Sequence, residues 1–381
     1  MISNTVIGWG ADLDVLVAEV PFNNALMRGV SIELDENQHD VAYIRVGGLP
    51  HKAVTEYRNA PVRIHYTTGG QQVHTFFGYI EEVRPRSVTT EGMISGSIIQ
   101  EAVIVCFGVS YAMRGATTKS WGSRSLTSVA QELAYKYKLS LSCPDLPAVF
   151  DNLLQHGESD FAFLIRTAKE HGYCVSIHGT HIDVWDPYQA LQRRKGLAYL
   201  RTLPGVKGQM NPSPGQILDF NGKFGRNSAD GRYKNTEVTV MDKRGTTFEV
   251  SSADVFNTDA EFSNRHTTML DSYAEAETTI EAAKRAEYDY TAKVQTLGVA
   301  SAIPGTVVDV QGFNADYDGY WYVRGVKHTI ATGVFTTEFD LGRNIVSQFS
   351  PSVVDHFRTP PAPSYIGGKW QASRLKSYIY A

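Results

Sequence analysis

Two long regions of this chain, residues 1–114 and 196–343, contain runs in which apolar and polar residues alternate. This period of two constrains the fold more than any other feature. Residues 30–34 and 42–46 both place an apolar side chain at every second position. Successive side chains of a β-strand point to opposite faces, so such runs are typical of half-buried strands. Over residues 1–114 the pattern predicts a small antiparallel barrel or sandwich. Its further strands are expected at residues 15–20, 61–66, 73–77, 79–83 and 92–107.

The period changes to a helical one over residues 115–195. Apolar residues spaced three and four apart predict a helix at about residues 125–137. A second helix is expected to begin at Ser159, which is a good N-cap, and to end at Gly172. Together with a hairpin over residues 173–185, these helices predict an inserted α+β domain, which we call the insert.

The strand pattern returns over residues 196–343, after a linker rich in Gly and Pro at residues 196–215. One long helix is expected at about residues 272–294, because its Ala and Ile residues are spaced for one helical face and its charges are mixed. Strands are expected at residues 217–224, 236–242, 246–250, 305–310, 319–327 and 333–341. The predicted fold class is mainly β with an α+β insert: two small antiparallel β-barrel domains, the inserted domain and one long helix in the second barrel region.

Residues 344–381 are predicted to form an extended C-terminal arm. Their middle holds four prolines, which disfavour both helix and strand. Their end is aromatic and has no core of its own, and such tails often dock on a partner. A terminus packed back on its own chain is the alternative. The residues expected to contact a partner are Tyr365, Trp370, Leu375, Tyr378 and Ile379.

The formal net charge of -4 at pH 7 argues against a broad nucleic-acid-binding surface, which would need an excess of basic residues. No apolar run approaches the roughly 20 residues that span a bilayer, so no membrane anchor is expected. Residues 1–11 lack the basic start and apolar stretch of a secretory signal, which predicts synthesis and folding in a cytoplasm. The widely spaced Cys106, Cys143 and Cys174 are expected to be small buried hydrophobic residues.

Candidate clusters for catalysis or metal binding fail on spacing or on context. His178 and His181 flank a predicted hairpin turn, but metal binding needs three or four convergent ligands, so a cross-strand surface pair is expected. Glu81 and Glu82 are adjacent on a strand and point to opposite faces, so they cannot flank one glycosidic bond. No Gly-x-Ser-x-Gly motif is present in the sequence. We therefore predict that the protein is not an enzyme and has no catalytic residues, no cofactor and no bound metal.

Four short segments occur in an order that is informative. The first is the strand at residues 75–83, and the second is residues 119–126, which have the spacing K-x-W-x-x-x-x-L. The third and most specific is residues 158–173, and the fourth is the strand pair at residues 320–341, preceded by Pro-Gly at residues 304–305. The signature residues in these segments are Gly78, Trp121, Glu158, Ser159, Asp160, Phe163, Leu164, Arg166, Gly172, Gly305 and His328.

In this order, the segments resemble the late control protein D family of phage baseplate and tail hubs, and they are similar to the hub half of VgrG spikes. Thr167 stands where the family usually has Leu, which is a mild departure. The resemblance implies two barrels per subunit facing a central channel, and three subunits forming a ring of six barrels. Such a ring matches a six-fold tail tube on one side and a three-fold spike on the other.

The function implied by the resemblance is that of a structural baseplate hub at the tail tip of a phage virion, made in the host cytoplasm. The expected partners are further copies of the chain in a homotrimer, the tail tube protein, a separate central spike protein and other baseplate or tail proteins. DNA or the tape-measure protein would pass through the lumen without sequence-specific binding. No spike-like repeat follows the second β region, so the spike is expected to be a separate protein.

Two alternatives stay open on the sequence. The chain also fits the hub of a bacterial contractile injection system or a tailocin, because the same motifs would serve there. The Ser125-Leu126 start of the first predicted helix also resembles LysM-type glycan-binding modules. That second resemblance would suit a peptidoglycan-binding or cell-wall-degrading tail protein.

Overall fold

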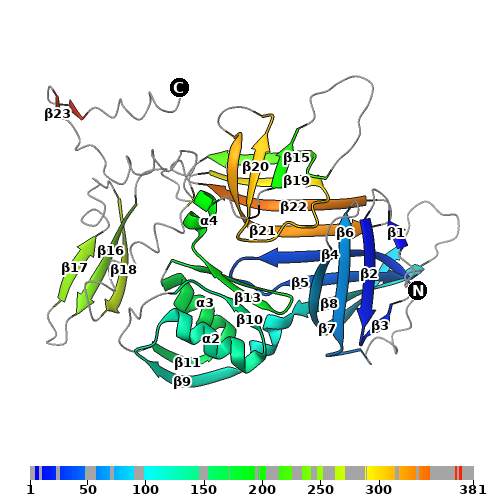
Figure 1. The fold of residues 1–381 in the computed structure, drawn as a ribbon, viewed down its shortest axis with the longest axis horizontal. Helices are drawn as coiled ribbons and strands as arrows, with labels where there is room; N and C mark the ends of the chain where they lie inside the picture. The colour runs from blue at the N-terminus through cyan, green and yellow to red at the C-terminus, as the bar shows by residue number, and fades with distance from the viewer. Residues whose placement is uncertain are drawn as a thin grey trace.

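A computed structural model gives the fold, and most of its described residues lie in strands (Figure 1). The prediction of a mainly β fold with an α+β insert is confirmed. The description covers residues 5–7, 11–22, 26–47, 57–68, 73–89, 98–145, 153–170, 172–193, 196, 198–202, 214–224, 234–241, 247–251, 262–270, 288, 290–313, 317–331, 334–343, 365–366 and 369–370.

The first β unit consists of the strands within residues 5–108. In the sheet they follow the order β1–β2–β6–β7–β8–β5–β4, and each neighbouring pair is antiparallel. Ala42, Ile44 and Val46 of β5 are buried, whereas Tyr43 and Arg45 between them are half-buried, as the period of two predicts. The strands are β1 (Thr5–Ile7), β2 (Ala11–Val17), β3 (Val20–Pro21), β4 (Met27–Asp35), β5 (Val41–Gly47), β6 (Pro61–Thr68), β7 (His74–Thr89) and β8 (Ile98–Gly108).

The second β unit closes into a barrel. Its strands pair in the order β14–β20–β21–β22–β19–β15, and a bridge between Arg201 and Gln216 returns the ring to β14. The pairing is antiparallel as predicted, except at β14, which runs parallel to β20 and to Gln216. The strands are β14 (Ala198–Arg201), β15 (Ile217–Phe224), β19 (Tyr290–Leu297), β20 (Val307–Gln311), β21 (Gly319–Ala331) and β22 (Val334–Arg343).

The closure of this barrel depends on a glycine. The N–H of Arg201 donates to the carbonyl oxygen of Gly215 at 3.1 Å. Gly215 has a φ of +82°, and a Cβ there would lie 2.4 Å from the carbonyl oxygen of Tyr199. Any other residue would therefore force the two ends of the barrel apart.

One hairpin joins the two β units into a continuous sheet. The C-terminal half of β21 pairs with β4 of the first unit. Near the hairpin tip, Ile330 and Phe335 are buried in the core of the first unit. Nearer its base, Val323 and Leu341 are buried in the core of the second unit. The two predicted barrel regions therefore share a hairpin.

The insert packs helices between two small sheets. α3 contacts β12 on one side and β11 on the other, and α2 contacts both α3 and β10 (Figure 1). The predicted apolar face of the first helix is confirmed, because Leu126, Val129 and Leu133 are buried. Its elements, which follow the 3-10 helix η1 (Val109–Met113), are β9 (Ala116–Gly122), α2 (Leu126–Tyr137), β10 (Ser140–Ser142), β11 (Leu153–Ser159), α3 (Asp160–Glu170), β12 (Cys174–His178), β13 (His181–Trp185) and α4 (Pro187–Arg193).

The long helix predicted at about residues 272–294 is wrong at its C-terminal end. Residues from Tyr290 onward form β19, which pairs with β15 and β22. The reason is a local period of two, since Ala292, Val294 and Thr296 are buried and the residues between them are exposed. Residues 272–287, which hold most of the predicted helix, lie outside the described residues.

Two further small sheets complete the described part of the chain. The strands β16 (Lys234–Met241), β17 (Thr247–Ser251) and β18 (Phe262–Leu270) form a sheet in the order β17–β16–β18, which confirms two of the strands predicted there. Within the C-terminal arm, β23 (Tyr365–Ile366) pairs with β24 (Lys369–Trp370). Among the helices that are described, none is long and apolar enough to cross a membrane.

Candidate functional site

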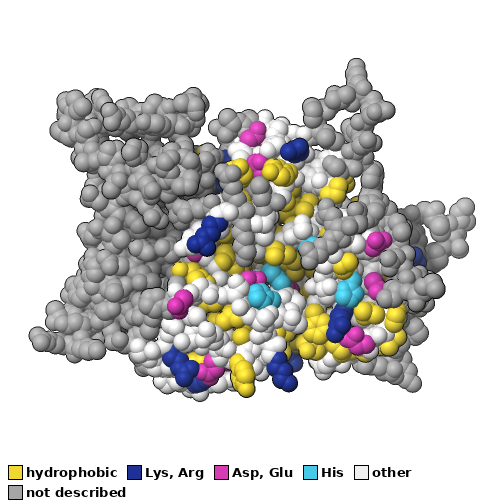
Figure 2. Space-filling model, in the orientation of Figure 1, with side chains coloured by type: hydrophobic (Ala, Val, Ile, Leu, Met, Phe, Trp, Pro, Cys, Tyr) yellow, Lys and Arg dark blue, Asp and Glu magenta, His cyan; other side chains and the backbone are white. Residues whose placement is uncertain are grey.

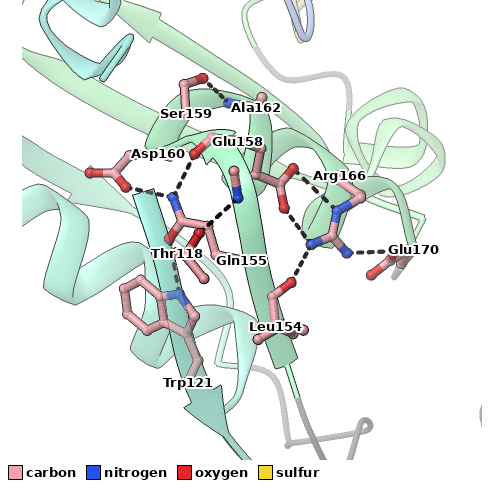
Figure 3. Close-up of polar contacts among 11 residues, drawn as sticks. Thr118, Trp121, Leu154, Gln155, Glu158, Ser159, Asp160, Ala162, Arg166 and Glu170 are labelled. Carbon is pink, nitrogen blue, oxygen red and sulfur yellow. Dashed lines mark hydrogen bonds and ion pairs between the residues drawn. The ribbon is translucent and has the colours of Figure 1, made fainter. Parts of the chain in front are cut away.

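The signature at residues 158–166 is part of a hydrogen-bonded network inside the insert (Figure 3). At its centre lies Gln155 of β11, whose side chain is fully buried. The Oε1 atom of Gln155 accepts from Nε1 of Trp121 at 3.1 Å, and its Nε2 donates to Oδ1 of Asp160 at 2.8 Å. The same Nε2 donates to the carbonyl oxygen of Glu158 at 3.2 Å. One amide therefore ties together β9, β11 and the start of α3.

Asp160 is the buried acid of this network. Its Oδ2 accepts from Nζ of Lys136 at 2.5 Å and from the hydroxyl of Tyr137 at 2.6 Å, both at the end of α2. Burial raises the pKa of Asp160, but the hydrogen bonds from Gln155, Lys136 and Tyr137 outweigh it and lower the pKa below its ordinary value. The carboxylate is therefore ionised and fully bonded inside the protein.

Arg166 holds α3 against β11 from the other side (Figure 3). Its guanidinium donates to both carboxylate oxygens of Glu158, at 2.7 and 3.4 Å, and to the carbonyl oxygen of Leu154 at 2.9 Å. It also pairs with Glu170 one turn along the helix at 3.0 Å. The hydrogen bond to Glu158 is the main reason that the pKa of Arg166 is raised, against the opposing effect of burial.

The helix start and the aromatic packing complete this signature. The hydroxyl of Ser159 accepts from the N–H of Ala162 at 3.1 Å, so the predicted N-cap is confirmed. Phe163 stacks on Trp121 with ring centroids 5.4 Å apart, and both Phe163 and Leu164 are fully buried. The predicted residues are thus brought together, and their arrangement is that of an internal support for the insert.

The three signature glycines allow close packing or a turn. A Cβ at Gly78 would lie 2.2 Å from the carbonyl oxygen of Phe107, where β7 meets β8. Gly172 has a φ of +75° and follows α3, which ends at Glu170. A Cβ at Gly305 would lie 2.7 Å from the ring of Trp185, so this glycine lets the insert approach the second β unit.

His328 is fully buried on β21. Its Nδ1 lies 3.1 Å from the hydroxyl of Thr337, and its Nε2 lies 3.2 Å from the carbonyl oxygen of Ala302. The carbonyl accepts only, so Nε2 carries the proton and Nδ1 accepts from Thr337. Burial is the main reason that the pKa of His328 is lowered to about 4, so the ring is neutral at pH 7.

A turn between β4 and β5, residues 36–40, holds the insert against the β units, and we call it the junction turn. The N–H of Asn37 donates to the carbonyl oxygen of Val175 at 2.7 Å, and the N–H of Val175 donates to Oδ1 of Asn37 at 3.0 Å. The ring of His39 stacks on Phe161 of α3 with centroids 4.2 Å apart. Sequence reasoning missed this turn because its partners lie far away along the chain.

The junction turn ends at Asp40, which pairs with His178 of β12. The Nδ1 atom of His178 lies 2.8 Å from Oδ2 of Asp40, and the two side chains are 16% and 3% exposed. His178 and His181 are cross-strand neighbours as predicted. The prediction that both lie at the surface is wrong for His178, because its ring turns inward to reach Asp40.

The junction turn begins at Glu36, which links three parts of the chain. The hydroxyl of Tyr322 on β21 donates to Oε2 of Glu36 at 2.6 Å and accepts from Nε1 of Trp185 at 2.8 Å. Arg324 contributes an ion pair to Glu36 at 3.4 Å. Trp185 belongs to the insert, Tyr322 to the second β unit and Glu36 to the first, so this chain of bonds fixes all three.

The three cysteines differ in their exposure. Cys106 and Cys174 are buried as expected, whereas Cys143 is partly exposed. Within the described ranges, no three His, Cys, Asp or Glu side chains converge where they could hold a metal ion.

A family model described as the Alg8 N-terminal domain matches residues 113–332. The match runs from the end of η1 through the insert and through the strands of the second β unit that precede β22, and it ends just after β21. It covers more than half of the chain. The chain belongs to the Alg8 N-terminal domain family. The region matched by the Alg8 N-terminal domain model contains every signature residue except Gly78, so the network of Figure 3 lies wholly within it. No curated protein sequence matches the chain.

Solved structures extend the comparison beyond the Alg8 N-terminal domain match to almost the whole chain. The tail protein from Neisseria meningitidis MC58 is similar, with 13% identity, a TM-score of 0.62, and coverage of 88% of this chain and 97% of that one. The 43 kDa tail protein of prophage MuSo2 from Shewanella oneidensis has 11% identity and a TM-score of 0.60, covering 88% and 98%. At these identities the likeness is one of fold.

A third structure comes from a bacterial secretion device. The E. coli c3393 protein, described as a component of the type VI secretion system with structural similarity to T4 bacteriophage tail proteins, has 10% identity and a TM-score of 0.52. The match covers 85% of this chain and 76% of that one. This Alg8 N-terminal domain family member therefore shares its fold with tail-type proteins of phages and of a secretion system.

The remaining predicted residues belong to the C-terminal arm. Tyr365 and Trp370 lie on β23 and β24 and are partners in that strand pair. Leu375, Tyr378 and Ile379 lie outside the described residues. Partner contact by these five residues stays a prediction.

Exposed apolar side chains mark two further places on the first β unit that sequence reasoning missed. Figure 2 shows hydrophobic side chains gathered over the lower ends of the upright strands of the first β unit, where Figure 1 draws β7 and β8. In this unit Val20 and Val73 are exposed by 63% and 56%, and the guanidinium of Arg63 lies 5.4 Å from the ring centre of Phe77. Large exposed apolar residues of this kind are candidates for contact with other proteins.

Proposed function

We propose that this chain is a structural hub subunit of the late control protein D type, placed at the baseplate of a phage tail. Three copies would form a ring that adapts the six-fold tail tube to a three-fold central spike and surrounds the channel for DNA or tape-measure protein. The observation that carries this proposal is the fold shared with two tail proteins over 88% of this chain and nearly all of theirs.

The joined β units support a role as a wall segment. A closed barrel and a curled sheet share the β21–β22 hairpin, so the two units cannot rotate independently without breaking the pairing of β4 with β21. Two β units in each of three copies would supply six segments around a channel, which is the number that a six-fold tube requires. The exposed Val20 and Val73 would lie between copies or against the tube.

The solvent face where the two units join suits a channel that does not retain DNA. On this face Lys327 of β21 pairs with Glu33 of β4 at 2.8 Å, and Glu338 of β22 is its neighbour on the other side. Acidic residues on both sides of the lysine balance its charge at this position, which weakens its attraction for phosphate groups. DNA or a tape-measure protein would then pass without sequence-specific binding.

We propose that the protein acts by assembly and without catalysis. The polar clusters of the insert and of the junction turn are occupied by bonds within the chain, and these bonds support the fold. Purified protein is expected to leave peptidoglycan intact in a zymogram. A cleared zone that forms with the protein and is absent without it would overturn the non-enzymatic proposal.

The alternative is the equivalent hub in a bacterial contractile injection system or tailocin, and the likeness to a type VI secretion component favours it. Neighbouring genes discriminate between the two, because capsid and terminase genes accompany a phage. The ring is tested by negative-stain imaging of the chain mixed with its tube and spike proteins. A three-fold ring is expected, and a strict monomer in the presence of both partners would contradict the hub proposal.

A further inference from the structure

The Asp40–His178 pair joins two parts of the chain that are 138 residues apart. Asp40 ends the junction turn, and its carbonyl oxygen accepts from the N–H of Gly108 at 2.7 Å, so its backbone is fixed to the first β unit. His178 lies at the tip of the β12–β13 hairpin of the insert. Docking of the insert therefore brings the imidazole to a carboxylate that is already in place.

Each member of the pair depends on the other. The second carboxylate oxygen of Asp40, Oδ1, and the second ring nitrogen of His178, Nε2, are buried and have no hydrogen-bond partner among the described residues. With Asp40 only 3% exposed, the proton shared with His178 is the main compensation for its negative charge. A buried charge that loses its partner is costly, whereas the same charge in water is not.

We propose that this pair is a proton-dependent latch, which holds the insert against the first β unit and loosens as the pH rises above 6.5. When His178 is protonated, the docked state contains an imidazolium beside a carboxylate. When that proton leaves, the docked state retains a buried carboxylate with only a neutral partner. Undocking then gains the hydration of Asp40, so the equilibrium moves toward the loosened state. This inference goes beyond the hub function and does not depend on it.

The direction follows from the titration of both groups. Burial lowers the pKa of His178, but the charge of Asp40, its hydrogen bond and the charge of Asp183 together raise it above 6.5. Burial raises the pKa of Asp40 above 3.8, although His178 acts against this. Both groups hold their protons more firmly when docked, so docking is favoured at low pH. The pair contributes its full stabilisation of docking below pH 6.5. This stabilisation is lost as the pH rises through the raised pKa of His178.

The other titratable groups around the pair do not replace this proton. His39 of the same turn has a pKa lowered by burial, so it is neutral near pH 7. Tyr66 of β6 and Asp35 of β4 feel the charge of Asp40, and the pKa of each is raised, chiefly by burial. Asp183 of β13 pairs with His181 at 3.4 Å on the more exposed side of the hairpin.

The first test is an NMR titration of the whole chain labelled with 15N-histidine, in which the His178 signal is identified by its loss in His178→Gln. The midpoint of His178 is expected above 6.5 in the wild type. In Asp40→Asn the effect of burial is no longer offset by Asp40, so the midpoint should fall by at least about one pH unit. An unchanged midpoint in Asp40→Asn would overturn the latch.

The second test follows docking through amide exchange at Asn37 and Val175, whose mutual hydrogen bonds bridge the interface. After correction for intrinsic exchange, their protection should fall roughly tenfold between pH 6.5 and pH 9, relative to amides within α2. Asp40→Asn and His178→Gln should abolish this pH dependence. The matched control is His181→Gln, which removes the neighbouring exposed imidazole and should retain it. Equal pH dependence in all four proteins, or none in the wild type, would contradict the proposal.

Discussion

Gln155 donates and accepts hydrogen bonds between three elements while its side chain is out of reach of water. Each of its neighbours, Trp121 and Asp160, would keep a buried polar group without a partner if the amide were removed. Buried polar groups that lose a partner cost more than the bond itself contributes, because water cannot replace it. At the residue scale, the stability of the signature network therefore depends on Gln155, a residue that lies outside the segment at residues 158–173.

Replacing this amide by a side chain of similar volume tests that view. Gln155→Leu is expected to lower the free energy of unfolding by roughly 3 kcal/mol, since two buried groups are orphaned. The control is Thr118→Ala, which removes an exposed acceptor 3.2 Å from the N–H of Gly157 and should cost less than about 1 kcal/mol. Urea unfolding followed by circular dichroism measures both. Equal costs would show that burial of Gln155 is unimportant.

Because of His328, the free energy of unfolding depends on pH in the acidic range. Its folded pKa is about 4 against 6.5 for the free group, so between these values the unfolded chain binds more protons than the folded one. The free energy of unfolding must then fall as the pH drops through this window, by up to roughly 3 kcal/mol. The change should be absent from the pH profile of His328→Gln. Parallel profiles of the two proteins between pH 7 and pH 4 would contradict this assignment.

At the scale of elements, the residues at the two ends of α2 show how this helix begins and ends. The hydroxyl of Ser125 accepts from the N–H of Ser128, which fixes the start of α2. The helix ends at Lys138, which adopts a left-handed conformation with a φ of +55°. A side chain at this position is strained, because the left-handed region favours glycine. The sequence offers no glycine there, and the N–H of Lys138 closes the last turn by donating to the carbonyl oxygens of Ala134 and Tyr135.

A glycine at this position should relieve the strain. Lys138→Gly is expected to raise the free energy of unfolding by about 0.5–1 kcal/mol, because the left-handed turn is retained without a Cβ. Lys138→Ala is the matched control and should not stabilise the protein, since alanine keeps the Cβ. Thermal unfolding of the two variants distinguishes them. A gain for both would assign the effect to the loss of the lysine charge.

At the scale of the whole molecule, the shared β21–β22 hairpin and the junction turn make one body from three sequence regions. The hairpin continues the sheet from one β unit to the other, and the junction turn anchors the insert at Asn37 and Asp40. Exposed apolar residues of the first β unit are then left as candidates for contacts between copies. The proposed ring therefore depends on a surface that makes little contribution to the fold itself.

This surface can be tested without unfolding the subunit. Val20→Asp combined with Val73→Asp is expected to weaken ring assembly by at least about tenfold, because charges would enter an apolar contact. Their exposure predicts little change in thermal stability. The control is Tyr135→Asp on α2, a residue that is 89% exposed. Assembly is measured by mass photometry with the tube and spike proteins. Rings that form normally in the double variant would exclude both residues from the contacts between copies.

Sequence periodicity by itself determined most strands of the two β units, with β14 and β19 among the exceptions, and the helices α2 and α3 of the insert, since burial of alternate residues and of one helical face is a local requirement. It also determined the Ser159 cap, whose partner Ala162 is three residues away. Tertiary structure alone decided the pairing of β4 with β21, the inward turn of His178 and the strand at Tyr290, which sequence reasoning assigned to a helix. Those outcomes depend on partners that are distant in the chain. Hydrophobic periodicity and composition do not specify which distant residues will come into contact.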